Sequence, residues 1–250
     1  MKNRRALVAV LSVMLLAGIS SWSAGWFSPT ETTIHKLAPG VYFRKILNEP
    51  EFIGCNQGWV IFKDYVLVID ANFPNQAEEL IKAVRKTTDK PIRYVFDTHY
   101  HGDHADGNPI YTRMGAIAVA SENSRELFDT KGIAGFRKSQ EEKPEEYGKL
   151  DYEKPSLYFP KKLVLDDGEM RVELIHFGHA HTAGDAIAWL PKQGIAFTGD
   201  AIVNGPFNYT GDSNTGSWIG VLTEVEKLPI KRVAPGHGEP SDKGLVKMQK

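Results

Sequence analysis

Residues 97–108 of the chain read Asp97-Thr98-His99-Tyr100-His101-Gly102-Asp103-His104-Ala105-Asp106-Gly107-Asn108. They follow the apolar run at residues 92–96, which predicts a buried strand. Three imidazoles and a carboxylate lie between positions 99 and 104, although the chain has only 8 histidines in 250 residues. A solvated polar loop with chance histidines is the alternative, and this local density argues against it. The stretch predicts a metal site at the end of a strand.

The spacing of these side chains indicates two adjacent metal ions. His99, His101 and Asp103 are two residues apart, so they share one side while the chain stays extended. His104 points elsewhere unless the backbone turns, and Gly102 gives it the freedom to turn. Zinc takes about four ligands and accepts both imidazole and carboxylate. Four candidates this close together predict two metals, each completed by ligands from later in the chain.

The first residues have the pattern of an export signal. A positive segment at residues 1–5 precedes an apolar run at residues 6–19, and residues 21–23 offer small side chains for cleavage. We expect a signal peptide at residues 1–23 and a mature chain that begins near Ala24. The protein would then be exported, periplasmic or extracellular, with no stable membrane insertion after cleavage. An uncleaved N-terminal anchor is the alternative.

The composition is that of an ordinary globular protein with one large domain or two small ones. Hydrophobic residues make up 42% of the chain, charged residues 24%, and the net charge is -1. This balance offers no basic surface of the kind that binds nucleic acid. We expect a small-molecule substrate and no nucleic-acid partner, while the oligomeric state stays open. Cys55 is the only cysteine, so no disulfide can form within the chain.

Apolar runs that alternate with helical patterns predict an α/β fold. After a tether at residues 24–40, one domain is expected over residues 41–250. Strands are expected at residues 41–47, 59–62, 66–69, 92–96, 116–120, 163–165, 172–176, 186–190, 195–198 and 231–234. Helices are expected at residues 75–88, from 105 or 106 to 114, and at 218–228.

Residues 121–160 interrupt this alternation. They are rich in Lys and Glu and carry scattered aromatic side chains. A surface helical excursion and a lid beside the active site both fit that composition. We expect residues 47–54 and 141–160 to flank the substrate cleft, with Phe52 and Tyr152 as apolar contacts to the substrate.

Three later segments each end a β run in a glycine-containing turn with a metal-capable side chain. They are residues 177–185, 197–200 and 233–238, and they contain His181, Asp200 and His237. Strand ends are where α/β proteins build their sites. Asp97 could orient a ligand imidazole by hydrogen bonding or could be a turn residue at the strand end, and both alternatives stay open.

With these segments in this order, the chain resembles the metallo-β-lactamase-fold hydrolase superfamily over about residues 41–240. The motifs that carry the resemblance are Asp70 after a strand, His99-x-His101-x-Asp103-His104, His181-Thr182 with Gly184-Asp185, Gly199-Asp200 and Gly236-His237-Gly238. The resemblance implies a four-layer αβ/βα sandwich with two mixed sheets and the site at one edge between them.

The resemblance also implies the role of each ligand. One zinc would be held by His99, His101 and His181. The second would be held by Asp103, His104 and His237, with Asp200 as the bridge between the two ions. Asp70 would be structural and would support the loop of the first histidines. His181 is preferred over its neighbours His176 and His179 because it alone precedes a threonine, as in the family pattern.

The chemistry implied is hydrolysis of an ester, thioester, lactone or amide-like bond by a hydroxide held by two zinc ions. Asp103 could also accept the proton. An aspartate at position 200 looks like glyoxalase II and related hydrolases, whereas metallo-β-lactamases usually have Cys or Ser there. The chain is most similar to an exported, stand-alone hydrolase branch. The alternatives are a true metallo-β-lactamase and an oxidoreductase similar to persulfide dioxygenases, which use one Fe2+.

Overall fold

The apolar segments of the chain form two mixed β-sheets. A computed structural model describes the chain over residues 32–47, 54–205 and 208–250. The first sheet has seven strands in the order β1 to β7. Strands β1 to β4 form an antiparallel meander, and β4 to β7 run parallel to one another. Its strands are β1 (Thr33–Ala38), β2 (Val41–Lys45), β3 (Gln57–Ile61), β4 (Val66–Ile69), β5 (Ile92–Phe96), β6 (Ile117–Ser121) and β7 (Leu157–Phe159).

The second sheet has five strands in the order β12-β11-β10-β9-β8. Its neighbouring strands are antiparallel except for the parallel pair β11 and β12. The prediction of two mixed sheets is therefore confirmed. The strands are β8 (Lys162–Asp166), β9 (Arg171–Ile175), β10 (Ile187–Leu190), β11 (Ile195–Gly199) and β12 (Arg232–Pro235).

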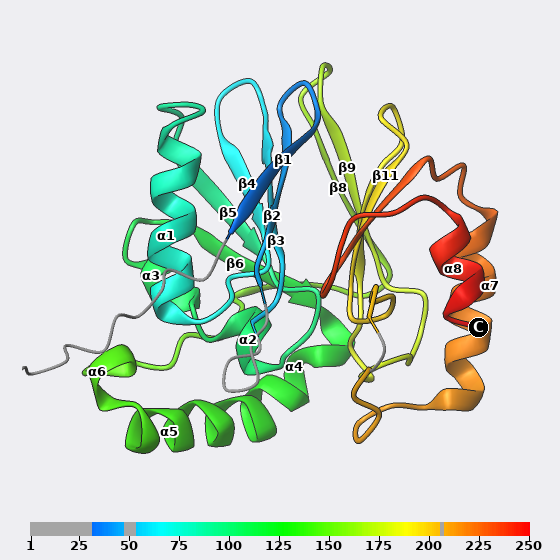
Figure 1. Cartoon of the computed structure of the whole chain (residues 1–250). Coiled ribbons are helices and arrows are strands. Elements are labelled where there is room, and N and C mark those ends of the chain that lie inside the picture. The colour runs from blue at the N-terminus through cyan, green and yellow to red at the C-terminus, as the bar shows by residue number, and fades with distance from the viewer. Residues whose placement is uncertain (1–31, 48–53, 206–207) are drawn as a thin grey trace, which may run out of the picture.

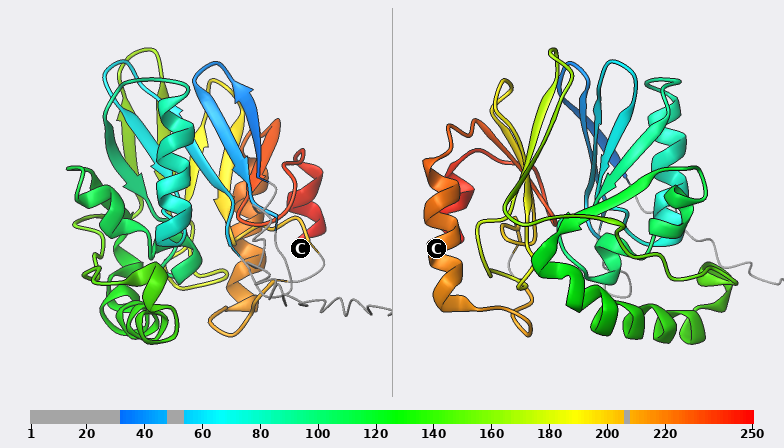
Figure 2. Two further views of the ribbon diagram at one scale, coloured as in Figure 1. Left: turned by 60° about the vertical axis from the view of Figure 1, so that its left-hand side comes forward. Right: turned by 180° about the vertical axis from the view of Figure 1, so that it is seen from behind.

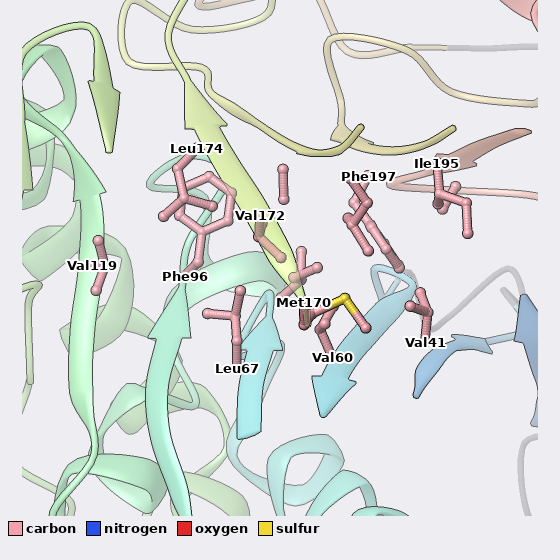
Figure 3. Close-up of a cluster of buried hydrophobic side chains, with 14 of the residues drawn as sticks. Val41, Val60, Leu67, Phe96, Val119, Met170, Val172, Leu174, Ile195 and Phe197 are labelled. Carbon is pink, nitrogen blue, oxygen red and sulfur yellow. The ribbon is translucent and has the colours of Figure 1, made fainter. Parts of the chain in front are cut away.

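The inner faces of the two sheets pack against each other and form a shared core (Figure 3). Leu67 on β4 and Phe96 on β5 belong to the same buried cluster as Val172 and Leu174 on β9. Strand β4 is buried at every position, because its other face is covered by a helix. This double burial explains the continuous apolar run that marks β4 in the sequence.

Helices form the two outer layers (Figures 1 and 2). Helices α1 (Pro74–Arg85) and α3 (Asn108–Thr112) cover the outer face of the first sheet, where Leu80 packs with Val68 and Val95. Helices α7 (Thr215–Lys227) and α8 (Gly244–Met248) cover the second sheet, where Leu222 packs with Trp189. The order helix, sheet, sheet, helix confirms the four-layer αβ/βα sandwich.

The chain between β5 and β7 is mainly helical. The helix expected from residue 105 or 106 to 114 is shorter than predicted and forms α3 over Asn108–Thr112, preceded by the separate turn α2. Gly107 packs tightly against the loop after β4 at this point, where a Cβ would lie 2.6 Å from the Ala71 carbonyl oxygen. Figure 1 shows α5 running below the lower ends of the strands. The helical segments here are α2 (Gly102–Ala105), η1 (Glu122–Ser124), α4 (Arg125–Leu127), η2 (Phe128–Gly132), α5 (Ile133–Glu142) and α6 (Pro144–Tyr147).

Two predictions concern the N-terminal part of the chain, namely a tether and a signal peptide. The predicted tether at residues 24–40 contains β1, which pairs with β2 from Thr33 onward, so the tether prediction is wrong for this part. Most of β1 is exposed or half-buried, and for that reason it lacks the apolar run that marks the other strands. The predicted signal peptide at residues 1–23 lies outside the described residues. In the described part of the chain, no helix is both long enough and apolar enough to cross a membrane.

Candidate metal centre

The candidate ligands gather at the carboxyl ends of β5, β11 and β12 and in the loop after β9. Strand β5 ends at Phe96 and leads into the histidine motif, while Asp200 follows β11 and His237 follows β12. Parallel neighbours such as β11 and β12 end at the same edge of their sheet. The two sheets therefore bring side chains that are far apart in sequence into one site.

The first cluster consists of His99, His101 and His181. His101 Nδ1 lies 3.0 Å from His99 Nε2 and 3.0 Å from His181 Nε2. One nitrogen of each ring thus points toward a common point, and these atoms lie within 4.8 Å of one another. Three imidazole nitrogens in this arrangement suit one zinc ion with an open position for a further ligand.

The second cluster consists of Asp103, His104 and His237. Asp103 Oδ2 lies 3.3 Å from His237 Nε2 and 3.6 Å from His104 Nε2. Helix α2 begins at Gly102, so His104 does not continue the alternation of His99 and His101. The His104 ring still lies close to that of His99, with centroids 4.1 Å apart, so the two clusters adjoin each other.

Asp200 lies between the two clusters. One carboxylate oxygen, Oδ2, is 3.6 Å from His181 Nε2 and 3.4 Å from His237 Nε2. The other oxygen, Oδ1, is 3.4 Å from His104 Nε2, and each of these two buried atoms lacks a hydrogen-bond partner within the described chain. Leaving such atoms unpaired in a protein interior is costly. Metal ions between the clusters would satisfy both atoms, so the residues present fit a pair of metals.

The imidazoles are held by a second set of side chains, as metal-bound histidines usually are. Asp70 Oδ2 lies 3.0 Å from His104 Nδ1, and its other oxygen accepts a hydrogen bond from the Thr98 amide at 2.8 Å. Asp212 Oδ2 lies 3.1 Å from His101 Nε2 and accepts a hydrogen bond from the Tyr100 hydroxyl at 2.6 Å. Both contacts leave the opposite ring nitrogen facing its cluster.

The pKa values of His99 and His181 in the first cluster differ in direction from that of His237 in the second. Burial lowers the pKa of His181 to about 4 and holds that of His99 well below its usual value, so these rings are neutral at pH 7. Burial also acts to lower the pKa of His237, but the adjacent Asp200 and Asp103 outweigh it and raise this pKa to about 10. Burial acts to raise the pKa of Asp200, and the neighbouring His237 and His104 hold it well below its usual value. Without metal, His237 therefore holds a proton at pH 7 that His99 and His181 do not.

Two other aspartates, Asp97 and Asp185, hold the loops around the site. Asp97 is buried and accepts a hydrogen bond from Asn108 Nδ2 at 2.7 Å, so it supports the start of α3 rather than a ligand imidazole. Asp185 accepts hydrogen bonds from the Thr182 amide at 2.9 Å and the Thr182 hydroxyl at 2.7 Å. It fixes the turn that follows His181.

A cleft of about 1130 Å³ opens over the two clusters. Leu47 lines it, and the neighbouring Phe52 lies outside the described residues. Tyr152 does not line it: its hydroxyl donates to the Phe128 carbonyl at 2.9 Å, and its ring packs against Phe136. The segment 131–139, rather than 141–160, forms the wall on this side. The prediction for Tyr152 as a substrate contact is therefore wrong.

Sequence reasoning missed three residues of this site. Asp212, Lys131 and Tyr209 all line the cleft, and Lys131 forms an ion pair with Asp212. The Tyr209 ring lies 5.7 Å from that of His101. The loop that holds Asp212 and Tyr209 has no periodic or spacing signal, and only the tertiary fold brings it to the histidines.

Comparisons with known proteins agree with this fold. The family model described as the metallo-β-lactamase superfamily matches residues 51–237, so the chain belongs to that superfamily. A metallo-β-lactamase type 2 from Bacillus cereus is 26% identical over 187 residues, which span 72% of this chain and 66% of that protein. One from Bacteroides fragilis is 24% identical over 229 residues, which span 88% of this chain and 84% of that protein.

A solved structure of a metallo-β-lactamase from Pontibacter korlensis superposes with a TM-score of 0.71. It is 21% identical, and the match covers 87% of this chain and 96% of the other. At this identity the likeness concerns the fold alone. The chain covers slightly less than two thirds of the Bacillus cereus relative.

Proposed function

We propose that the protein is a zinc-dependent hydrolase that cleaves an ester, thioester, lactone or amide-like bond in a small molecule. The observation that carries this proposal is the pair of complete ligand clusters with Asp200 between them. His99, His101 and His181 would hold one ion, Asp103, His104 and His237 the other. Imidazole nitrogen and carboxylate oxygen, without thiolate, are donors that zinc accepts.

Bound zinc supplies a nucleophile at neutral pH, because it lowers the pKa of coordinated water to about 7, and it polarises the oxygen of the scissile group. Asp103 faces the cleft with a side chain that is 20% exposed. Burial acts to raise its pKa, but the adjacent His104 and His237 keep this pKa below its usual value. Asp103 is thus ionised at pH 7 and would accept the proton of the attacking water and return it to the leaving group.

The alternatives make different demands on the same residues. A persulfide dioxygenase with one Fe2+ would need only one ligand set, whereas the second cluster here is complete and contains the buried atom His104 Nε2, which lacks a hydrogen-bond partner within the described chain. A β-lactamase activity is favoured by the names of the relatives from Bacillus cereus and Bacteroides fragilis. We therefore include β-lactams among the test substrates.

The test is a hydrolysis panel of thioesters, lactones, β-lactams and phosphodiesters with zinc-loaded protein. We expect turnover of at least one carbonyl substrate, its loss after removal of metal by a chelator, and its return with zinc. Turnover that survives complete metal removal would contradict the proposal. Turnover that returns with Fe2+ and O2 but not with zinc would favour the dioxygenase.

We also propose that the protein is exported, with residues 1–23 as a cleaved signal peptide. The support is the positive segment, the apolar run and the small residues that follow it. Mass spectrometry of protein from the native cell envelope should show a mature N-terminus near Ala24. Recovery of the intact chain from Met1 in the membrane fraction would contradict this.

A further inference from the structure

The walls of the cleft above the two clusters are mostly apolar. Ile46 and Leu47 follow β2, Phe73 precedes α1, and Val203 follows β11. The cleft of about 1130 Å³ exceeds the volume of roughly 300–1,000 Å³ that is common for small-molecule sites. Its size and its walls suit a substrate with a large apolar part beside the bond that reacts.

Helix α5 leaves room for such a part. Gly132, Gly135 and Ser139 line the cleft, and they lie on the same side of the helical segment because they are three and four residues apart. A Cβ at Gly135 would meet no atom within 4 Å. A larger side chain at Gly135 would therefore extend into the space beside this wall.

The positive charges that line the cleft are already paired. Lys45 forms an ion pair with Glu239, and Lys131 forms one with Asp212. Asp106 adds a buried carboxyl group to the lining, where it accepts a hydrogen bond from the Tyr147 hydroxyl at 2.7 Å. Among the described lining residues, both lysine ammonium groups therefore already form ion pairs with carboxylates of the protein. A substrate carboxylate would have to compete with these carboxylates for them.

We propose that the preferred substrate is an ester or thioester with a long, uncharged alkyl chain on the acyl side, and that this chain lies along Gly132 at the end of η2 and Gly135 and Ser139 on α5. This inference rests on the proposed hydrolase function. Hydrolysis adds the oxygen of water to the acyl carbon, breaks the carbon–oxygen or carbon–sulfur bond, and delivers a proton to the leaving alcohol or thiol. The products are a long-chain carboxylate, a neutral alcohol or thiol, and one proton that passes to the solvent when the carboxylic acid ionises.

The test compares butanoyl, octanoyl and dodecanoyl thioesters of one neutral thiol with zinc-loaded protein. In the wild type we expect kcat/KM to rise at least about tenfold from butanoyl to octanoyl, since each buried methylene contributes several-fold. Gly135→Leu should lower the octanoyl-to-butanoyl ratio of kcat/KM about tenfold. Gly220→Leu is the matched control, because Gly220 is also an exposed helical glycine with no atom within 4 Å of its Cβ position. Leucine is a good helix former, so both variants should fold.

A second comparison tests the charge argument. The octanoyl thioester should have a higher kcat/KM than the same thioester with a carboxylate at the end of the chain, again by about tenfold. An equal or reversed preference would overturn the assignment of an uncharged chain. Turnover without any dependence on chain length would overturn the inference while leaving the hydrolase proposal intact.

A binding measurement keeps the inference testable if no thioester is hydrolysed, an outcome that would count against the proposed function. Calorimetry with zinc-loaded protein should then show that octanoyl hydroxamic acid binds at least about tenfold more tightly than butanoyl hydroxamic acid. Gly135→Leu should remove that difference, and Gly220→Leu should keep it. Equal binding of the two compounds by the wild type would overturn the inference.

Discussion

Replacement of Asp212 by asparagine should weaken metal binding at the first cluster and leave the second cluster unchanged. Asp212 Oδ2 lies 3.1 Å from His101 Nε2, so its charge holds the proton on that nitrogen and leaves Nδ1 free for the metal. Asparagine keeps an oxygen acceptor but removes the charge. Loss of such an orienting carboxylate typically costs about 10- to 100-fold in metal affinity, or about 1.4–2.7 kcal/mol.

The assay is competition with a chelator of known zinc affinity, with cobalt absorbance to distinguish the two sites. Asp129→Asn is the matched control, because Asp129 pairs with Lys154 on the surface and touches no imidazole in the described chain. A thermal melt of each metal-free variant checks the fold. The reasoning is refuted if Asp212→Asn binds both metals as tightly as wild type, or if the second cluster weakens as much as the first.

Three further predictions concern the same site and the core. Asp200→Asn should weaken binding of the second metal and lower kcat at least about 100-fold. Asp185→Asn, the same chemical change in a turn, should have a far smaller effect on both. Metal content and turnover of the two variants test this. The pKa of His237 is raised to about 10 and that of His104 lies well above its usual value, so metal binding at the second cluster should release about one to two protons at pH 7 and weaken as the pH falls. Calorimetry in two buffers counts the protons, and binding at this cluster without proton release would contradict the assignment. Gly58→Ala should lower the free energy of unfolding in urea by about 1–3 kcal/mol, because the added Cβ would lie 2.3 Å from the Phe197 ring. An unchanged urea midpoint would contradict this and show that the core can adjust.

The fold was predictable from sequence wherever burial leaves an apolar run. Strand β5 was predicted with the observed limits, Ile92–Phe96, and β4 with Val66–Ile69. Strand β1 was missed because most of its positions are exposed or half-buried, so that pairing with β2, rather than packing, defines it. Helix boundaries shifted by a few residues, as at α1, where Pro74 begins the helix and Arg85 ends it.

The candidate ligands were recognisable because glycine turns and strand ends mark them in the sequence. Their proposed division into two clusters stays a prediction, and the start of α2 at Gly102, between His101 and His104, is compatible with it. The supporting residues carry no such mark. Asp212 lies 111 residues from His101 and acquires its role only through the fold.

Metal content tests the central claim most directly. The full chain should be purified without added metal or chelator, and zinc and iron should be measured per chain by mass spectrometry. Two clusters that share Asp200 predict close to two zinc ions per chain and little iron. A single tightly bound ion, above all one iron, that cannot be raised to two by added zinc would contradict the assignment of a dinuclear zinc site.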